Sequence, residues 1–86
     1  MKFTTVTIPA TGSTSFGTAS IEFVRGVLEA HPSNAGIIYV KRSTDAGNGY
    51  PFAAGATLEI TNQDDLSHYV VSGVVGGRMA AAYEED

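Results

Sequence analysis

Two runs of sequence decide the fold, and they are Asn34-Ala35-Gly36-Ile37-Ile38-Tyr39-Val40 and Gly49-Tyr50-Pro51-Phe52-Ala53-Ala54-Gly55-Ala56-Thr57-Leu58. Each run begins with Asn or Gly, which accept the left-handed backbone conformations that turns require. Each then continues into aliphatic, aromatic and β-branched residues, which favour strands. The pattern predicts a turn, a strand, a Gly-rich loop, a second turn and a second strand.

Other strands are predicted on both sides of these runs. Lys2 to Ile8 is rich in Thr, Val and Ile and ends at Pro9, and Ala10 to Ser20 is predicted to be a loop with a short edge strand around Ser15 to Thr18. The other predicted strands are Ile37 to Lys41, Tyr50 to Phe52 at an edge, Ala56 to Thr61, Leu66 to Val75 and Arg78 to Tyr83. Between the last two, Gly76-Gly77 predicts a two-residue hairpin turn. Asn62 to Asp65 is predicted to be a solvated loop, and Glu84 to Asp86 an acidic tail.

The segment from Ile21 to Ala30 fits two structures. Apolar residues at Ile21, Val24 and Leu28 fit helical spacing, whereas Gly26 and the β-branched residues favour a strand. As a strand, it would direct Val24, Gly26, Leu28 and Ala30 to one face. The strand-like surroundings favour the strand, and the helix stays open as the alternative.

Turn signals recur every eight to twelve residues or so, which is typical of sandwiches and barrels. The sequence therefore predicts an all-β fold, a small antiparallel β-sandwich or jelly-roll-like barrel of six to eight strands, with residues 1–86 forming one domain. The predicted core contains the apolar residue that each strand directs inward: Val6, Ile8, Val24, Leu28, Ile38, Val40, Leu58, Ile60, Val70 and Val74.

Composition excludes several classes of function. The net charge of −4 argues against binding a phosphate backbone, and the absence of Cys leaves neither disulfides nor a Cys-based zinc site. No apolar run approaches the roughly 20 residues of a membrane span, and no signal-peptide core follows the N-terminus. Charged residues are only 16% of the chain, below the roughly 25% that is usual, which favours a surface partly covered by contacts.

The candidate chemical residues do not form a recognisable site. His31 and His68 could bind a metal with Asp64 or Asp65, but their spacing matches neither a zinc nor a calcium motif. We therefore expect no catalytic residues, no metal and no cofactor, and we do not expect an enzyme. An aromatic platform for stacking sugars is a second reading of Tyr39, Tyr50, Phe52, Tyr69 and Tyr83, for which core and interface packing is the favoured one.

Four segments together resemble a family of small structural proteins from the virions of tailed bacteriophages. They are Arg25 to Ala30, Asn34 to Val40, Gly49 to Ala56 and Tyr69 to Gly73. The shared pattern is an Asn-x-Gly turn before an aliphatic-Tyr-Val strand, then a Gly-x-Pro-aliphatic-x-x-Gly loop, and it spans about residues 24 to 83. The resemblance implies a β-sandwich that serves as a head decoration (cement) protein or as a part of the tail.

The same resemblance implies partners and a location. It implies binding to the major capsid protein or another virion subunit, and a place on the capsid surface after assembly in the host cytoplasm. A homo-oligomer, preferably a trimer, would match the symmetry of a shell, and neither nucleic acid nor a membrane is an expected partner. The alternative is a tail- or fibre-associated module that binds a carbohydrate or a receptor. The predicted interface residues are Lys2, Phe3, Thr5, Thr7, Phe16, Tyr50 and Phe52.

Overall fold

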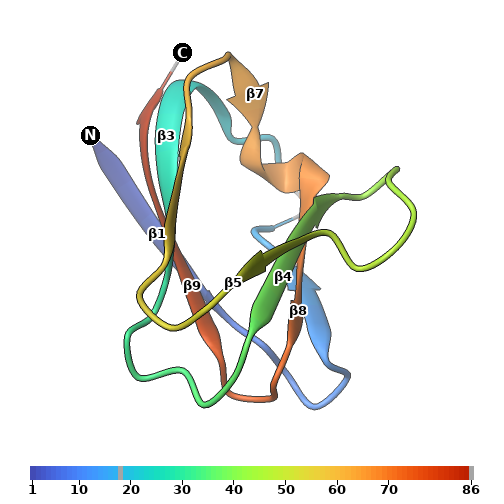
Figure 1. The fold of residues 1–86 in the computed structure, drawn as a ribbon. Coiled ribbons are helices and arrows are strands. Elements are labelled where there is room, and N and C mark those ends of the chain that lie inside the picture. The colour runs from blue at the N-terminus through green and yellow to red at the C-terminus, as the bar shows by residue number, and fades with distance from the viewer. Residues whose placement is uncertain (18, 86) are drawn as a thin grey trace.

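The protein consists of two antiparallel sheets packed face to face (Figure 1). The computed structural model describes residues 1–17 and 19–85. In the first sheet the strand order is β1 (Lys2–Thr7), β9 (Arg78–Glu85), β3 (Glu22–Ala30) and β6 (Thr57–Ile60), and β7 (Asp64–Asp65) pairs with the other end of β3. In the second sheet it is β2 (Ser13–Ser15), β8 (Tyr69–Gly73), β4 (Ile38–Arg42) and β5 (Tyr50–Phe52).

This arrangement confirms the predicted all-β class and is compatible with the predicted small antiparallel β-sandwich. The described residues contain nine strands rather than six to eight, because three of them have only two or three residues. One turn of 3₁₀ helix, η1 (Leu66–His68), joins β7 to β8. The segment that fitted both a helix and a strand is the longest strand, β3.

The core lies between the two sheets and takes inward-facing residues from β3, β4, β5, β8 and β9, together with three residues outside the strands, Ile8, Phe16 and Leu66. Its buried members are Ile8, Phe16, Phe23, Leu28, Ala30, Ile38, Val40, Phe52, Leu66, Val71, Met79, Ala81 and Tyr83. Of the predicted core residues, Ile8, Leu28, Ile38 and Val40 are buried. Three more, Val6, Leu58 and Ile60, are half-buried and pack against the core. The prediction is wrong for Val24, Val70 and Val74.

A β-bulge explains the position of Val24. The pairing of β3 with β9 shifts between Phe23 and Arg25, so that the bulged strand has one extra residue there. Phe23 therefore faces the core together with Leu28, although an uninterrupted strand would direct these two residues to opposite faces. The predicted faces of this strand are wrong before the bulge and correct after it, and Val24 is 37% exposed.

The turn η1 has the same effect on the segment predicted as one strand from Leu66 to Val75. Leu66 and Val71 are both buried, although their numbers differ by five. The 3₁₀ turn resets the alternation, and Val70 consequently lies on the outer side of β8 beside Lys41. The strand ends at Gly73, so Val74 lies in the following turn and is 42% exposed.

The predicted Gly76-Gly77 hairpin is also wrong. The strands on its two sides, β8 and β9, belong to different sheets, so the segment from Val74 to Gly77 carries the chain across the sandwich. The amide N–H of Gly76 donates to the carbonyl of Ile8, and the amide N–H of Ile8 donates to that of Gly77. These two hydrogen bonds continue the pairing of β1 with β9 by one residue on each strand, beyond Thr7 and Arg78.

The two runs that decide the fold form the outer half of the second sheet, β4 and β5, and the second run then continues into β6 of the first sheet. Ile38, Tyr39 and Val40 in β4 pair with Phe52, Pro51 and Tyr50 in β5. Pro51 has no N–H to donate, and β5 is accordingly the edge strand that its sequence predicted. Gly49 precedes β5 with φ +95°, and a Cβ atom there would lie 2.4 Å from the carbonyl oxygen of Val40. Glycine is therefore required at this turn by both its backbone angle and its surroundings.

Three smaller predictions have mixed outcomes. The short edge strand in the first loop is β2, which begins two residues earlier than predicted, and its predicted end at Thr18 lies outside the described residues. Glu84 and Glu85 belong to β9 rather than to an acidic tail, and Asp86 lies outside the described residues. Asp64 and Asp65 form strand β7 rather than a solvated loop, and Asp65 is only 8% exposed.

Candidate functional site: an alanine-lined furrow on the outer face of the first sheet

The outer face of the first sheet carries an exposed apolar row. Strand pairing places Phe3 in β1 opposite Ala82 in β9, Ala82 opposite Val27 in β3, and Val27 opposite Glu59 in β6. Residues directly opposite each other across paired strands lie on one face. The side chain of Phe3 is 78% exposed and that of Val27 is 37% exposed. A large apolar group that is open to solvent is more informative than a buried one, because burial is its favoured state.

Small residues on β9 hollow this face. Ala80 and Ala82 lie between larger residues on β1 and β3, and two shallow hollows of about 310 and 210 Å³ share Val27 and Ala82 in their walls. The first also contacts Met1 and Arg25, and the second contacts Phe3. We call this surface the alanine furrow, and it comprises Met1, Phe3, Arg25, Val27, Glu29, Thr57, Glu59, Ala80, Ala82 and Glu84.

Charged groups surround the furrow unevenly. Arg25 is neutralised by Glu84, since the guanidinium Nη2 lies 2.9 Å from the carboxylate Oε1. Glu29 and Glu59 are exposed on the β3 and β6 side of the furrow. Arg78 lies at the far end of β9, where its Nη2 donates to the hydroxyl of Ser33 at 3.3 Å. The charge beside the middle of the furrow is therefore acidic.

An open backbone edge adjoins the furrow. β1 pairs with β9 over its whole length, and no described strand pairs with its other side. The strand Lys-Phe-Thr-Thr-Val-Thr contains no proline or bulge, and Lys2 is its single charge. Prolines, bulges and several charged side chains are the features that usually protect an edge strand from pairing with another chain. Among the described edge strands β1 is the longest: β5 contains Pro51, β2 has only three residues, and β6, at the opposite edge of the first sheet, has four and exposes the charge of Glu59.

The structure divides the predicted interface residues into three groups. Phe3, Thr5 and Thr7 alternate along β1 and lie exposed on the outer face, next to the furrow. Lys2 forms an exposed ion pair with Glu85 at 3.0 Å, and Tyr50 lies on the second sheet and is 56% exposed. Phe16 and Phe52 are 7% and 0% exposed and belong to the core, so their side chains offer a partner no free surface.

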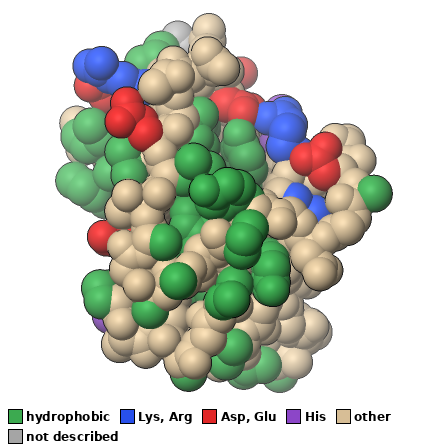
Figure 2. Space-filling view, viewed as in Figure 1, with side chains coloured by type: hydrophobic (Ala, Val, Ile, Leu, Met, Phe, Trp, Pro, Cys, Tyr) green, Lys and Arg blue, Asp and Glu red, His purple; other side chains and the backbone are tan. Residues whose placement is uncertain are grey.

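A third hollow opens between the edges of the two sheets, on the β5 and β6 side. It has a volume of about 240 Å³, and Leu58, Ile60 and Phe52 form much of its apolar wall. Arg42, Asp45 and Tyr50 contribute to the same lining. Figure 2 shows this side of the molecule, with hydrophobic side chains gathered in its middle and charged side chains above them. We call this hollow the edge groove.

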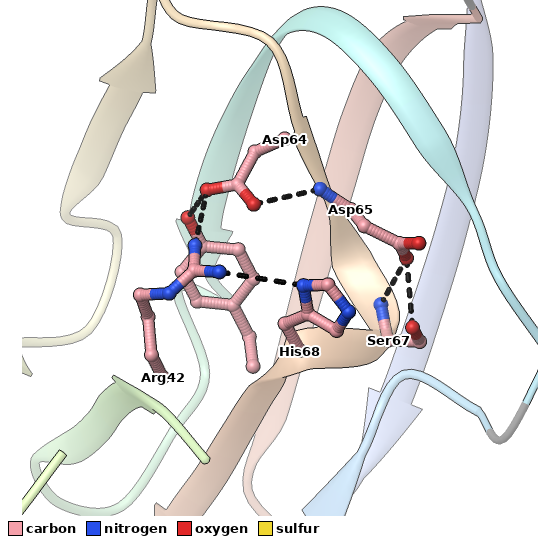
Figure 3. A network of polar contacts seen from close by, with 6 residues as sticks. Arg42, Asp64, Asp65, Ser67 and His68 are labelled. Atoms are coloured by element: carbon pink, nitrogen blue, oxygen red, sulfur yellow. Dashed lines mark hydrogen bonds and ion pairs between the residues drawn. The ribbon is translucent and has the colours of Figure 1, made fainter. Parts of the chain in front are cut away.

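A polar network lies beside the edge groove, where β4, β7, η1 and β8 meet (Figure 3). The carboxylate of Asp64 accepts hydrogen bonds from the Tyr69 hydroxyl and from Arg42, whose Nη1 lies 2.6 Å away. The second terminal nitrogen of the guanidinium, Nη2, lies 3.3 Å from Nδ1 of His68. The central carbon of the guanidinium lies 5.5 Å from the centre of the Tyr69 ring. We call these four residues and Asp65 the polar corner.

The ionisation of the polar corner follows from these contacts. Partial burial by itself would raise the pKa of Asp64, but hydrogen bonds from Arg42, Tyr69 and the Asp65 N–H, with the charge of Arg42, lower it. Burial and the neighbouring carboxylate of Asp64 raise the pKa of Tyr69 to about 12. At neutral pH the corner therefore holds a carboxylate, a guanidinium and a neutral phenol. Each of these groups already has a hydrogen-bond or ion-pair partner within the chain.

Asp65 has a structural role next to this network. Its carboxylate accepts hydrogen bonds from the Ser20 hydroxyl, from the Ile21 N–H at 2.9 Å, and from the N–H and hydroxyl of Ser67 at 2.9 and 2.8 Å. Burial would raise the pKa of Asp65, but these donors outweigh it and hold the pKa well below its usual range. Asp65 thereby caps η1 and ties the start of β3 to the turn that leads into β8.

The candidate metal ligands do not come together. The turn that contains His31 lies at the opposite end of the sandwich from η1, which contains His68 (Figure 1). His31 Nδ1 instead lies 2.7 Å from the Ser33 hydroxyl, within its own turn. Across residues 1–17 and 19–85, no group of three His, Cys, Asp or Glu side chains could hold a metal ion.

Sequence reasoning selected Phe3 but missed the residues that form the floor and the far wall of its surface. Ala80, Ala82 and Val27 were not predicted as interface residues. The available signal was the run Met79-Ala80-Ala81-Ala82-Tyr83, in which a strand has small side chains on both faces. On a central strand, the outward alanines must leave a depression between the larger residues of the two neighbouring strands.

The chain was compared with known proteins by family, by sequence and by structure. No family model matches it, and neither a curated protein nor a solved structure matches it. None of the helical segments in the described part of the chain is long and apolar enough to cross a membrane. The surface of this molecule, which offers an apolar furrow beside an open strand edge, is therefore the feature that points to a function.

Proposed function

We propose that this chain is a structural protein of a virion, and most simply a head decoration (cement) protein that binds and stabilises the assembled shell. The observation that carries the proposal is the exposed row of Phe3, Ala82 and Val27 beside the open edge of β1. The resemblance of the strand and turn pattern to small virion proteins of tailed bacteriophages supports the same conclusion. In this proposal the alanine furrow and β1 face the shell.

The physical chemistry of the surface favours binding. Apolar surface gains about 25 cal/mol for each Å² that is removed from water, and Phe3 and Val27 are available for such a gain. An unprotected edge strand can add main-chain hydrogen bonds to the same contact. A small domain that buries little of its own surface gains stability when a partner covers more of it.

Assembly on a shell would also favour a homo-oligomer. A decoration protein occupies repeated sites, and three copies around a threefold axis would match the symmetry of the lattice. The partner in this proposal is the major capsid protein or another virion subunit. The location is the capsid surface, reached during assembly in the host cytoplasm.

The edge groove favours one alternative, a tail- or fibre-associated module that binds a carbohydrate or a receptor. Tyr50 is 56% exposed and its ring packs edge-on against Phe52, with centroids 5.3 Å apart. An exposed aromatic ring next to polar groups such as Asp45 is a common surface for stacking sugars. Binding to a glycan array that Tyr50→Ala abolishes and Phe3→Asp leaves intact would favour this alternative over the first proposal.

The test of the first proposal is co-sedimentation with assembled particles prepared from the source of the chain. We expect the tagged chain to sediment at a fixed ratio to the shell subunit and to raise the temperature at which the shell opens. Phe3→Asp should abolish both effects, because it places a charge on the contact surface. Val75→Asp is the matched control, because Val75 is also exposed, at 59%, but lies in the turn before β9. Equal losses with both variants, or no binding by the unmodified chain, would contradict the proposal.

A further inference from the structure

The alanine furrow has the dimensions of a seat for a helix. Ala80 and Ala82 are two residues apart on β9, which places them about 7 Å apart along the strand. Residues four apart on a helix are separated by about 6 Å along its axis, so one stripe of side chains could enter both hollows. Phe3 and Val27 form the walls on the two sides.

Backbone hydrogen bonding distinguishes a helix from an extended segment. The strand under the furrow, β9, is already paired on both sides, with β1 and β3. An extended segment over this face would find no main-chain partners in the sheet, and covering its polar groups without partners costs free energy. A helix satisfies its backbone internally, and can therefore pack on the face of a sheet.

Charge selects the partner. Arg25 forms its ion pair with Glu84 and also attracts Glu59, so one guanidinium faces three carboxylates and the rim at Glu29 and Glu59 stays acidic overall. The chain as a whole carries a net charge of −4. A second copy would place an identical acidic rim against this one, which is unfavourable, whereas lysine or arginine on the flank of a partner helix would pair with both glutamates.

We propose that the alanine furrow binds a basic amphipathic helix of a partner protein, with small or medium apolar side chains in the hollows and a basic flank over Glu29 and Glu59. This inference deepens the proposed function and rests on its assignment of the furrow as the contact face. It adds the secondary structure and the charge of the segment that the shell protein, or another virion subunit, presents.

The first experiment uses two designed helical peptides of about 18 residues, long enough to hold a helix when one face is apolar. Both carry the same alanine and leucine stripe; one is flanked by lysines and the other by glutamates. Fluorescence anisotropy should show binding of the lysine peptide and at least about tenfold weaker binding of the glutamate peptide. Equal binding of the two peptides, or binding of neither at millimolar concentration, would overturn the proposal.

Variants separate the furrow from general attraction between opposite charges. Ala82→Arg fills the furrow and adds one positive charge, and Asn48→Arg adds the same charge in the exposed loop before β5. We expect Ala82→Arg to abolish binding of the lysine peptide and Asn48→Arg to change it less than about threefold. Similar losses of peptide binding in both variants would show that binding depends only on net charge, and would overturn the proposal.

Two further measurements complete the test. Glu59→Lys should weaken binding of the lysine peptide by about tenfold, and Asp45→Lys, an equal change of charge in the loop before β5, should not. Sedimentation equilibrium of the chain alone should show no self-association through the furrow. If the chain does self-associate and Ala82→Arg removes that association, a second copy occupies the furrow instead. The result of the peptide test is separable from that of the particle test. If the chain binds the shell, Phe3→Asp abolishes that binding, and no peptide binds, the helix proposal is refuted and the proposed function is kept.

Discussion

The polar corner and the alanine furrow differ in how their groups are satisfied. In the polar corner the carboxylate of Asp64 accepts from Arg42, Tyr69 and the Asp65 N–H, and Asp65 itself has four donors. Across the described residues, no buried side-chain nitrogen or oxygen lacks a hydrogen-bond partner. The furrow instead exposes the ring of Phe3, and its two hollows combine apolar residues such as Val27 and Ala82 with exposed glutamates at Glu29 and Glu59.

This difference assigns the two regions different roles. The corner has the residue types of an active site, Asp, Arg, His and Tyr. However, these side chains form hydrogen bonds and ion pairs within the chain, and those contacts hold β3, β4 and β8 together. The furrow has one ion pair, Arg25 with Glu84, and leaves the apolar side chains of Phe3 and Val27 exposed to solvent. A cluster of charged residues is therefore evidence of function only after the partners of each group are counted.

The comparison predicts its largest effect on stability at Asp65. Asp65→Ala should lower the free energy of unfolding by about 2–4 kcal/mol, because it leaves several donors at a buried site without their charged acceptor. Urea denaturation measures the change. Glu59→Ala in the furrow is the control and should stay within about 0.5 kcal/mol of the unmodified chain. If the two variants lost equal stability, the distinction between corner and furrow would be wrong.

Acid should act through the same residues. Asp64 and Asp65 have lower pKa values in the folded chain than in the unfolded one, so they stabilise the fold at any pH above their unfolded pKa of about 3.9. That stabilisation is lost as the pH falls from about 4 towards the lowered values. Urea midpoints measured from pH 5 down to pH 2 should fall, and should fall less steeply for Asp65→Ala. Parallel curves for the two proteins would contradict this assignment.

Much of the fold could be predicted from the sequence, because turn residues and alternation carry its main signals. Ile38 and Val40 in β4 and Leu28 in β3 are buried as their patterns indicated, and Pro51 lies in an edge strand. The errors occur where alternation is interrupted. The bulge after Phe23 and the turn η1 each shift the phase of a strand by one residue, and nothing in the local sequence fixes where such a shift occurs.

The candidate site was less accessible to sequence reasoning for a different reason. The furrow depends on which strands are neighbours, since Phe3, Val27 and Ala82 are distant in sequence and meet only because β1 and β3 pair with the two sides of β9. Exposed residues such as Phe3 could be proposed from the pattern of a single strand. The hydrogen bonds that the Asp65 carboxylate accepts could not be predicted in this way, because its donor Ser20 is 45 residues away in the sequence.

A smaller loss of stability is expected at Arg42. Arg42→Ala removes the contact of 2.6 Å with Asp64, but the Arg42 side chain is 42% exposed and Asp64 keeps the Tyr69 hydroxyl and the Asp65 N–H as donors. We expect a cost of about 1 kcal/mol, near the upper limit for ion pairs at a surface. Lys2→Ala breaks the more exposed pair with Glu85 and should cause no measurable change. A loss at Arg42 as large as that at Asp65 would place it among the residues that hold the fold together.

A smaller effect on stability than at Arg42 is expected in the furrow itself, at Phe3. Because its side chain is 78% exposed, Phe3→Ala removes little buried area and should change the free energy of unfolding by less than about 0.5 kcal/mol. The measurement should be made at two protein concentrations about a hundredfold apart, because stability that comes from association depends on concentration. A cost of 2 kcal/mol or more that grows with concentration would mean that Phe3 is buried against a second copy in solution. The furrow would then be an interface between identical chains, and the acidic rim around Glu59 would have to be neutralised within that assembly rather than by a basic partner.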